Sequence, residues 1–341
     1  MSEPLAGGGV ALATPAAASI SVRGLTKSYG DVEAVRGIDF EVSAGEIFGF
    51  LGPNGAGKST TISMLCTLVK PTGGTATVAG FDVNTQRDSV RRNIGLVFQD
   101  TTLDTYLTAE QNMRLHAELY GVERQLVEPR MRQVLEMVGL WERRGSAVAT
   151  FSGGMKRRLE IARGLLHSPR VLFLDEPTVG LDPQTRSSIW TYIRELKGAE
   201  DITIFLTTHY MDEAEYCDRI AIMDKGVIVV LDTPDALKAS IGHDRITLQT
   251  DDDQAAIAAL QERFQIAGQI SEETVIFGVP SGELFVPRLF AGLGVPIRSV
   301  SVSRPSLDDV FMSYTGTTIR DAEVSSSEQA RAATMAFRRS R

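Results

Sequence analysis

The chain has few cysteines, no excess of positive charge and no long apolar run, and each shortage excludes a class of protein. Its 341 residues include two cysteines, Cys66 and Cys217, which are too few for a disulfide framework and are not spaced as a metal site, so a reducing cytoplasm fits best. The formal net charge is −8, whereas a whole-chain nucleic-acid binder should be basic. The longest charge-free stretch, 4–22, is rich in Ala and Gly, and a membrane-spanning helix needs about 20 strongly apolar residues.

What remains is the composition of a globular protein, with 43% hydrophobic and 23% charged residues. The length suggests about two domains of roughly 100–200 residues each. Residues 1–19 are expected to form a disordered tail rather than a secretory signal. From Ile20 to Ile241, apolar strands alternate with helical segments, which predicts an α/β fold with a largely parallel sheet and helices on both faces.

A second, smaller unit is expected over 242–316, and is called the C-terminal unit below. Three strands, 246–250, 275–279 and 297–303, alternate with two helices, and a last helix runs from Leu307 to Tyr314. Between 251 and 309, nine acidic residues stand against four arginines, which makes a poor surface for DNA or anionic lipid. Residues 317–341 are rich in Ser and Ala and are expected to be disordered.

The strongest signal for chemistry runs from Gly52 to Thr60, between an apolar strand, Ile47–Leu51, and a helix. It matches G-x-x-x-x-G-K-[ST], the phosphate-binding loop. Glycines let the backbone wrap around phosphates, whose charge then faces the N–H groups and the helix N-terminus. Lys58 can reach the β- and γ-phosphates, and the Ser59 hydroxyl can ligate Mg²⁺. The expected phosphate contacts are Gly52, Pro53, Asn54, Gly55, Ala56, Gly57, Lys58, Ser59 and Thr60.

A second signal is an apolar strand, 171–174, that ends in Asp175 and Glu176. Such a strand puts both carboxylates at the carboxyl edge of the sheet, beside the phosphate loop. We expect Asp175 to hold Mg²⁺, directly or through water, and Glu176 to face the water that attacks the γ-phosphate. The alternative is a solvated strand-end pair, which the phosphate loop in the same chain disfavours.

The third signal is Phe151-Ser-Gly-Gly-Met-Lys156, in which a serine and two glycines open a helix. Ser152, Gly153 and Gly154 thus form a second anion site at a helix N-terminus. One nucleotide does not need two such sites from one chain, so the second is expected to face the nucleotide of another subunit. A plain N-cap serine is the alternative.

In their order along the chain, these motifs resemble those of the ATP-binding subunit of an ABC transporter, over roughly 20–241. The segment from Gly52 to Thr60 is similar to the family's phosphate loop, and 151–156 to its signature. Residues 174–182 are similar to its second nucleotide motif and the loop that follows. The resemblance implies an ABC-type P-loop NTPase fold, with an inserted helical subdomain at about 100–166 and a small α+β C-terminal domain, and ATP and Mg²⁺ as cofactors.

The resemblance also gives roles to single residues. Tyr29 is similar to the aromatic residue that stacks on adenine, and Gln99 to the glutamine that senses Mg²⁺ and links to the membrane subunit. His209 is similar to the histidine that contacts the γ-phosphate, and Asp182, in the loop after the second motif, is expected to contact nucleotide. Without these roles, Tyr29 is a surface aromatic, Gln99 a solvated strand end and His209 a structural loop histidine.

Departures in the signature narrow the resemblance. Phe151 replaces the family's leucine and Met155 its glutamine, while the serine and both glycines are intact. Together with Lys156-Arg-Arg158 and the ending 306–316, this pattern resembles the daunorubicin-resistance type of drug and polyketide-antibiotic exporters. In that subfamily the transmembrane subunit is a separate chain.

The implied function is an ATP-hydrolysing subunit that drives export of a drug-like, antibiotic or lipophilic compound through a separate multi-spanning permease, at the cytoplasmic face of the membrane. Two copies would form two composite ATP sites, each with Lys58, Ser59, Asp175 and Glu176 from one subunit and 152–154 from the other. The C-terminal unit is expected to stabilise this dimer or its docking to the permease. The alternative is that it only buries the end of the ATPase sheet.

Two other functions remain as alternatives. A non-transport ABC ATPase acting on ribosomes or DNA is disfavoured because the chain has one nucleotide module, no long coiled-coil insertion and an acidic balance, so no nucleic-acid partner is expected. A phosphoryl-transfer kinase would not need the second serine-glycine site or Glu176.

Overall fold

The computed structural model describes residues 18–316 except 200–201, 243 and 272–273. The tails that were expected to be disordered lie outside the described residues at 1–17 and 317–341. Strand β1 (Ala18–Tyr29) begins two residues before Ile20, where ordered structure was expected to start. Within the described residues, no helix has the length and apolar character to span a membrane.

The main body of the molecule, 18–241, is built around a six-stranded sheet in the order β10-β9-β3-β8-β7-β6. Neighbouring strands from β9 to β6 run parallel, and β10 pairs antiparallel with β9. Every residue of β3, β7 and β8 is buried, as expected for parallel strands covered on both faces. The predicted α/β fold is confirmed. The strands are β3 Ile47–Leu51, β6 Ile94–Val97, β7 Val171–Asp175, β8 Thr203–Thr208, β9 Arg219–Asp224 and β10 Val227–Asp232.

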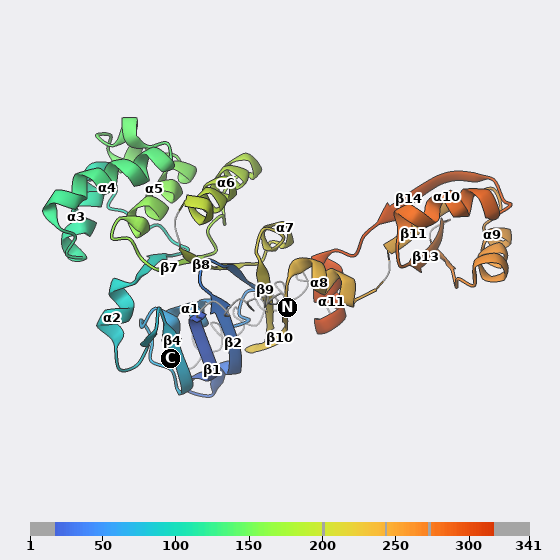
Figure 1. Ribbon diagram of the computed structural model, residues 1–341, viewed down its shortest axis with the longest axis horizontal. Coiled ribbons are helices and arrows are strands. Elements are labelled where there is room, and N and C mark those ends of the chain that lie inside the picture. Colours follow the sequence, from blue (N-terminus) through green and yellow to red (C-terminus); the bar gives the residue numbers. More distant parts are fainter. Residues whose placement is uncertain (1–17, 200–201, 243, 272–273, 317–341) are drawn as a thin grey trace, which may run out of the picture.

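Strand β3 shows how the sequence builds the two layers beside this sheet. Its side chains alternate, so Ile47 and Leu51 belong to one hydrophobic core and Phe48 and Phe50 to the other. Helix α1 (Lys58–Leu65) lies with the second core, and α5 (Gly153–Leu165) and α6 (Pro183–Ala199) lie across the sheet from it (Figure 1). The phosphate loop thus connects a buried strand to a helix, as predicted.

A second sheet, entirely antiparallel, covers the α1 side in the order β2-β1-β4-β5. The sequence analysis expected one largely parallel sheet and did not separate this layer from it. Phe40 of β2 stacks on Phe48 of the central sheet with ring centroids 5.6 Å apart, which joins the layers. The remaining strands are β2 Val32–Ser43, β4 Gly73–Val78 and β5 Phe81–Asp82.

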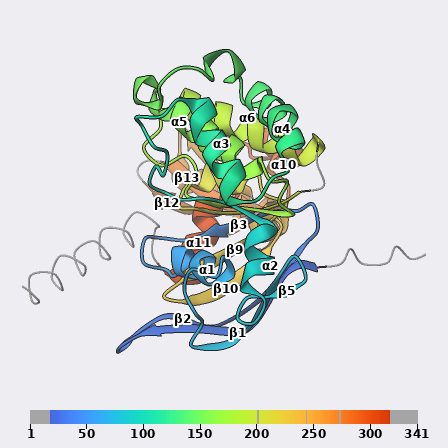
Figure 2. The same ribbon diagram turned by 90° about the vertical axis from the view of Figure 1, so that its left-hand side faces the viewer.

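Helices α3 (Ala109–Leu119) and α4 (Arg124–Met137) pack with α5 and stand away from the antiparallel sheet, as two views at right angles show (Figures 1 and 2). They lie within 100–166, where a helical subdomain was expected. A capping box stabilises the start of α3. The Thr108 side chain accepts a hydrogen bond from the Gln111 backbone N–H, and the Gln111 side chain accepts one from the Thr108 backbone N–H. Helix α2 (Arg87–Arg92) lies between β5 and β6 in the chain and contacts both strands.

The C-terminal unit contains a separate lobe, here called the accessory lobe and defined as 244–303. Its antiparallel sheet has the order β12-β13-β11-β14 and encloses its own hydrophobic core with α9 and α10. The lobe projects from the main body (Figure 1). The elements are β11 Asp244–Thr250, α9 Asp253–Ala259 with a π-turn at Leu260–Phe264, β12 Gln269–Ser271, β13 Thr274–Val279, α10 Gly282–Gly292 and β14 Ile297–Ser303.

The last helix, α11 (Leu307–Thr315), does not pack on the accessory lobe. The sequence analysis grouped it with the C-terminal unit, but its buried residues Leu307, Val310 and Phe311 belong to a core of the main body. The helix contacts α8 (Pro234–Ser240), α7 (Met211–Ala214) and β10. The accessory lobe is therefore inserted between two helices, α8 and α11, that pack on each other.

Candidate nucleotide site

The phosphate loop is shaped by close backbone contacts that only glycine allows. A Cβ on Gly52 would lie 2.2 Å from the Met223 carbonyl oxygen, and Gly57, the N-cap of α1, has φ +109°. Lys58 is 4% exposed, and its Nζ donates hydrogen bonds to the carbonyl oxygens of Gly52 at 2.7 Å and Pro53 at 3.1 Å. The ammonium group is therefore held inside the curve of the loop, where it can meet an anion.

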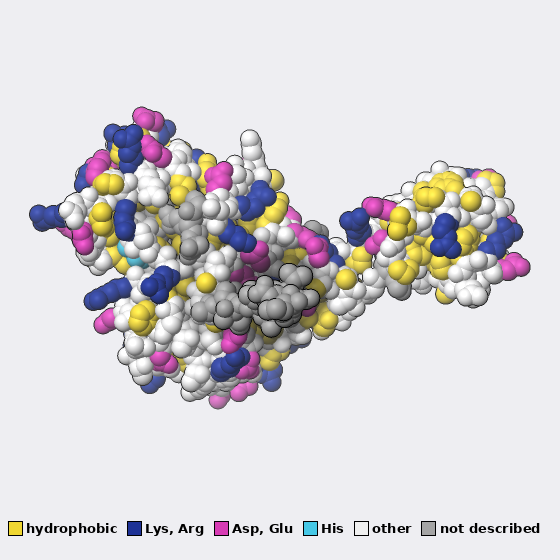
Figure 3. Space-filling model, viewed as in Figure 1, with side chains coloured by type: hydrophobic (Ala, Val, Ile, Leu, Met, Phe, Trp, Pro, Cys, Tyr) yellow, Lys and Arg dark blue, Asp and Glu magenta, His cyan; other side chains and the backbone are white. Residues whose placement is uncertain are grey.

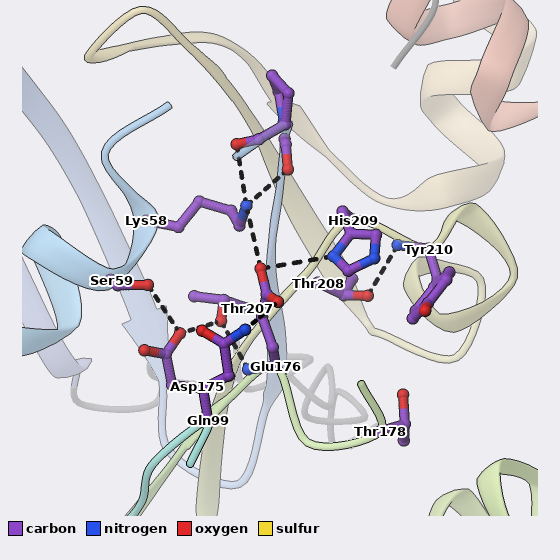
Figure 4. A network of polar contacts seen from close by, with 12 residues as sticks. Lys58, Ser59, Gln99, Asp175, Glu176, Thr178, Thr207, Thr208, His209 and Tyr210 are labelled. Atoms are coloured by element: carbon purple, nitrogen blue, oxygen red, sulfur yellow. Dashed lines mark hydrogen bonds and ion pairs between the residues drawn. The ribbon is translucent and has the colours of Figure 1, made fainter. Parts of the chain in front are cut away.

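Ser59 and Asp175, which were predicted to bind Mg²⁺, are in direct contact. Ser59 Oγ donates to Asp175 Oδ1 at 3.1 Å, and Thr207 Oγ1 from β8 donates to the same oxygen at 2.5 Å (Figure 4). Hydroxyl and carboxylate oxygens are the hard donors that Mg²⁺ prefers, and this ion commonly takes one or two protein ligands together with water and substrate phosphates. The pair therefore fits a Mg²⁺ ion that is bound jointly with a nucleotide.

Glu176 sits at the centre of the site in an unusual backbone conformation. Its φ is +45°, a region that non-glycine residues seldom occupy, and its N–H donates to Thr207 Oγ1 at 2.9 Å. Its Oε1 atom lies 3.5 Å from Lys58 Nζ. Burial would raise the pKa of the Glu176 carboxyl, but the neighbouring His209 and the charge of Lys58 outweigh it, so the pKa lies below its usual range. The carboxylate is ionised at neutral pH and can accept a proton.

Gln99 and His209 approach Glu176 from the two neighbouring strands. Gln99, after β6, donates from Nε2 to Glu176 Oε2 at 3.3 Å. His209, after β8, has its Nδ1 atom 3.5 Å from Glu176 Oε1, at the outer limit of a hydrogen bond. The carboxyl ends of β6, β7 and β8 thus bring three predicted residues together (Figure 4). This agrees with the general position of sites in parallel sheets.

Tyr29 belongs to the same cavity. This cavity of about 300 Å³ is lined by Tyr29, Lys58, Ser59, Gln99 and Glu176, among others. Tyr29 ends β1 with its side chain half exposed, and the Lys27 ammonium lies 4.8 Å from its ring centroid. Tyr29 is therefore half exposed in the wall of this cavity, beside the phosphate loop, where a base could stack on it.

The signature residues 152–155 lie away from the cavity that Lys58 lines. Ser152 caps α5, accepting a hydrogen bond from the Met155 backbone N–H at 3.3 Å, so the N-cap alternative describes its contact within one chain. Ser152, Gly154 and Met155 line a cavity of about 140 Å³ together with Thr185, whereas Lys58 lines the other cavity. A Cβ on Gly154 would lie 2.4 Å from Thr185 Cγ2. The contact of 152–154 with a nucleotide remains a prediction.

Asp182 has a local structural role. Its carboxylate accepts hydrogen bonds from the Thr185 backbone N–H at 3.0 Å and from Thr185 Oγ1 at 2.6 Å, which caps the first turn of α6. These bonds from Thr185 lower the pKa of the Asp182 carboxyl. Both carboxylate oxygens are engaged, so a contact between Asp182 and nucleotide also remains a prediction.

The sequence analysis did not identify Arg157 as part of the site. This arginine of α5 is 6% exposed, and its guanidinium donates to the carbonyl oxygens of Pro177 at 2.6 Å, Asp175 at 3.1 Å and Glu176 at 3.2 Å. It also donates to the Phe98 carbonyl, next to Gln99. Arg157 therefore fixes the signature helix to the backbone on both sides of the site. The run Lys156-Arg-Arg158 was noted, but nothing in one sequence singles out its middle residue.

Comparison with known proteins identifies the class to which this fold and site belong. The family model described as ABC transporter matches residues 35–179, and the model described as ATP-binding protein DrrA1-3-like, C-terminal domain, matches 233–315. A solved structure described as the ATP binding subunit of an ABC transporter is similar with a TM-score of 0.59 and 31% identity, over 65% of this chain and 92% of that one. The chain belongs to the ATP-binding subunits of ABC transporters and is an ATPase.

Within that family, the chain is similar over most of its length to resistance proteins. It is 40% identical to the daunorubicin/doxorubicin resistance ATP-binding protein DrrA of Streptomyces peucetius, over 87% of this chain and 92% of that protein. It is 37% identical to the linearmycin resistance ATP-binding protein LnrL of Bacillus subtilis (strain 168), over 89% and 100%. The suspected resemblance to the daunorubicin-resistance type is confirmed.

A solved dimer provides a further comparison. The ATP-binding cassette MJ0796, in a dimeric post-hydrolysis state bound to ADP and Pi, is similar with a TM-score of 0.57 and 27% identity, over 63% of this chain and 98% of that one. The C-terminal family match, 233–315, begins in front of α8 and ends at the last residue of α11. It thus spans the two helices that pack together and the accessory lobe between them.

Proposed function

We propose that this protein is the ATPase of an exporter, and that two copies hydrolyse ATP at composite sites to drive a drug-like or lipophilic compound through a separate permease. The observation that carries the proposal is the convergence of Lys58, Ser59, Gln99, Asp175 and Glu176 on one cavity or its wall. The names of the resistance proteins support the class of compound. The permease holds the protein at the cytoplasmic face of the membrane.

Within one chain, the residues divide the work of hydrolysis. Tyr29 stacks on adenine, and the phosphate loop and Lys58 bind the phosphates. Ser59, Asp175 and Gln99 would hold Mg²⁺, which would neutralise charge on the phosphate oxygens. Glu176 orients the attacking water and accepts its proton, because its carboxylate is ionised and its backbone is fixed by hydrogen bonds with Arg157 and Thr207. His209 contacts the γ-phosphate beside Glu176.

The second anion site serves the nucleotide of the other copy. Ser152 and Gly154 line a separate cavity from Lys58 in the same chain, and this separation supports a nucleotide sandwiched between subunits. Closing of the pair on ATP, and reopening after hydrolysis, would then move the permease.

A cleft beside Gln99 is the docking position that we propose for the permease. It measures about 970 Å³, and its lining includes the large exposed side chains Leu68, Phe98 and Leu119 with Arg91 and Arg92 among its charged residues. Phe98 precedes Gln99, which donates to Glu176. A movement of the permease at this cleft would therefore be transmitted to the Glu176 carboxylate through Gln99.

Mixing two inactive variants tests the composite site. Lys58→Ala removes the phosphate contact and Gly154→Asp introduces a carboxylate at the second anion site, where the Cβ also collides with Thr185. If the sites are composite, a mixed dimer contains one site free of both changes, and hydrolysis returns when the subunits exchange. Under exchange conditions, a mixture as inactive as either variant alone would contradict the sandwich.

A further inference from the structure

Beyond the predicted residues, a buried carboxylate connects the two loops that carry Glu176 and His209. Glu213, on α7, is 2% exposed. Its Oε1 atom accepts a hydrogen bond from Thr178 Oγ1, and its Oε2 atom accepts one from Thr208 Oγ1 at 2.8 Å. Thr178 follows Glu176 by two residues, and Thr208 directly precedes His209. One carboxylate therefore connects the segment that follows β7 to the last residue of β8.

The two threonine hydroxyl groups that donate to Glu213 are buried. Thr178 and Thr208 are each 1% exposed, so a hydroxyl that lost Glu213 would be left without water to replace it. Thr208 Oγ1 in turn accepts the Tyr210 backbone N–H at 3.0 Å (Figure 4), which fixes the chain on both sides of His209. The bridge thus constrains backbone as well as side chains.

Glu213 is also compensated in charge. The Nε atom of Arg186, on α6, lies 3.4 Å from Glu213 Oε1. The Nη2 atom of the same side chain lies 3.1 Å from Asp212 Oδ2. Its guanidinium packs over the Tyr210 ring, 3.9 Å from the centroid. Because Arg186 has Asp212 and Tyr210 as further partners, neutralising Glu213 does not leave an isolated buried cation. The fold can therefore survive a change that removes the bridge.

We infer that Glu213 is a positioning residue for ATP hydrolysis, whose carboxylate holds the loop of Glu176 in register with the loop of His209. The inference rests on the proposed roles of Glu176 and His209. These two side chains are 3.5 Å apart, and both must meet one γ-phosphate and one water, so a small relative shift of their loops changes the reacting geometry. Misplacement of about 1 Å can cost up to about 100-fold in rate.

The test compares Glu213→Gln with Glu215→Gln in the full-length chain. Glu215 lies two residues along, is more exposed, and pairs with Lys238 at 2.7 Å, so it serves as a matched control. ATP-binding stoichiometry, kcat and KM are measured for each. We expect kcat per ATP-binding site to fall at least about 10-fold in Glu213→Gln, with KM within about 3-fold of the unchanged protein. Glu215→Gln should leave all three quantities unchanged.

Variants of the two threonines separate positioning from general destabilisation. Thr178→Val and Thr208→Val remove the donors at nearly constant volume and should each lower kcat per site, while Thr178→Ser and Thr208→Ser keep the hydroxyl and should restore it. Thr178→Val should cost clearly less in a Glu213→Gln background, because it acts through the same carboxylate. Thr208→Val also removes the acceptor for the Tyr210 N–H, so it is not used for this comparison. Additive losses for Thr178→Val and Glu213→Gln, or a loss of activity that only follows the loss of ATP-binding sites, would overturn the inference.

Assaying Glu176→Gln in parallel distinguishes the two possible failures. A Glu213→Gln variant with unchanged kcat, beside a Glu176→Gln variant that has lost hydrolysis, overturns the positioning role alone. A Glu176→Gln variant that hydrolyses ATP at the normal rate overturns the proposed catalytic site, and the positioning role with it.

Discussion

Ser59 Oγ donates a hydrogen bond to Asp175 Oδ1 at 3.1 Å, although 116 residues separate the two in sequence. This bond joins the start of α1 to the end of β7, and it brings together the two oxygen ligands that we propose for Mg²⁺. Thr207 holds the same Asp175 oxygen from β8, so the carboxylate has one defined orientation. Contacts within the protein therefore arrange the metal site that we propose.

Asp175→Asn tests this site. The amide keeps the shape but removes the negative charge, so Mg²⁺ should no longer strengthen nucleotide binding, and hydrolysis should fall at least about 100-fold. Affinity for ATP is measured with Mg²⁺ and with EDTA, in the unchanged protein and in the variant. The two proteins should bind ATP alike in EDTA and differ in Mg²⁺. An equal response to Mg²⁺ in both would remove Asp175 from the metal site.

Glu176→Gln tests the proposed base. It preserves the shape of the side chain and its contact with Gln99 while removing basicity, so ATP should bind but hydrolysis should fall by at least about 100-fold. The variant should accumulate as an ATP-bound dimer, detectable by light scattering. Glu195→Gln, an exposed change on α6, is the control. Steady-state hydrolysis near the normal rate would show that Glu176 is not the base.

Motif spacing and the geometry of parallel sheets predict only part of this site. Gly52 to Thr60 is a contiguous motif, and the rule that parallel strands end at one edge of a sheet places Asp175 and Glu176 beside it. The roles of Tyr29, Gln99 and His209 came from the resemblance to the family. Arg157, Thr207 and Glu213 could not be found in this way. Each acts through contacts with residues distant in sequence, such as Arg157 with Phe98, 59 residues away, and one sequence contains no sign of those contacts.

The fold shows the same limit. Gly73 and Gly74 are of a residue type that often ends a helix, but they open β4, which pairs with β1. The apolar spacing of Leu307, Val310, Phe311 and Tyr314 predicts a buried face on α11. The first three residues are buried, whereas Tyr314 is 42% exposed. The spacing could not show which surface covers that face, because amphipathicity defines a stripe and not its partner. The covering surface proved to be the main body.

Phe311→Ala tests whether α11 is part of the main body. Phe311 is fully buried among residues of that core, so its truncation should lower the free energy of unfolding by about 3–5 kcal/mol. Met312→Ala, next to it and 48% exposed, should change it by about 0.5 kcal/mol or less. The free energies come from urea unfolding with and without ATP. A loss for Phe311→Ala no larger than for Met312→Ala would show that α11 contributes little to this core.

Two histidines predict a loss of stability in acid. Burial, followed by the charges of Arg163 and His167, lowers the pKa of His116 to about 3, and burial lowers the pKa of His167 as well. Above the unfolded pKa of about 6.5 neither state is protonated. Below it, the unfolded chain binds a proton that the folded protein does not, so stability falls as the pH falls.

For His116 alone, this linkage amounts to at most about 1.4 kcal/mol between pH 7.5 and 5.5. The variant His116→Gln should therefore show a smaller loss over this interval than the unchanged protein, by up to that amount. Urea unfolding at the two pH values measures it, with Leu115→Gln, an exposed neighbour, as the control. The same loss in both proteins would mean that His116 is protonated when folded.

The position of the accessory lobe between α8 and α11 determines how its role can be tested. Truncation after Gly242 removes α11 too, and it would expose apolar residues of α7 and α8 such as Met211 and Leu237. Replacement of 244–303 by a short Gly/Ser linker keeps α11 in the chain. Because the lobe has its own core, this replacement should leave the main body folded.

We propose that the accessory lobe stabilises the dimer or its docking to the permease, through protein contacts. The face of the accessory lobe that is seen in Figure 3 carries hydrophobic side chains. Leu284 and Phe290 on α10 are 77% and 56% exposed. The excess of acidic residues in the lobe disfavours lipid head groups as its binding partner. The replacement variant should bind ATP near normally but dimerise or support transport poorly. ATP titration, light scattering and transport in cells that contain the permease measure these properties. If the replacement variant dimerises and supports transport normally, the lobe has neither role. If the truncation after Gly242 is insoluble in the same experiment, the structural contribution belongs to α11.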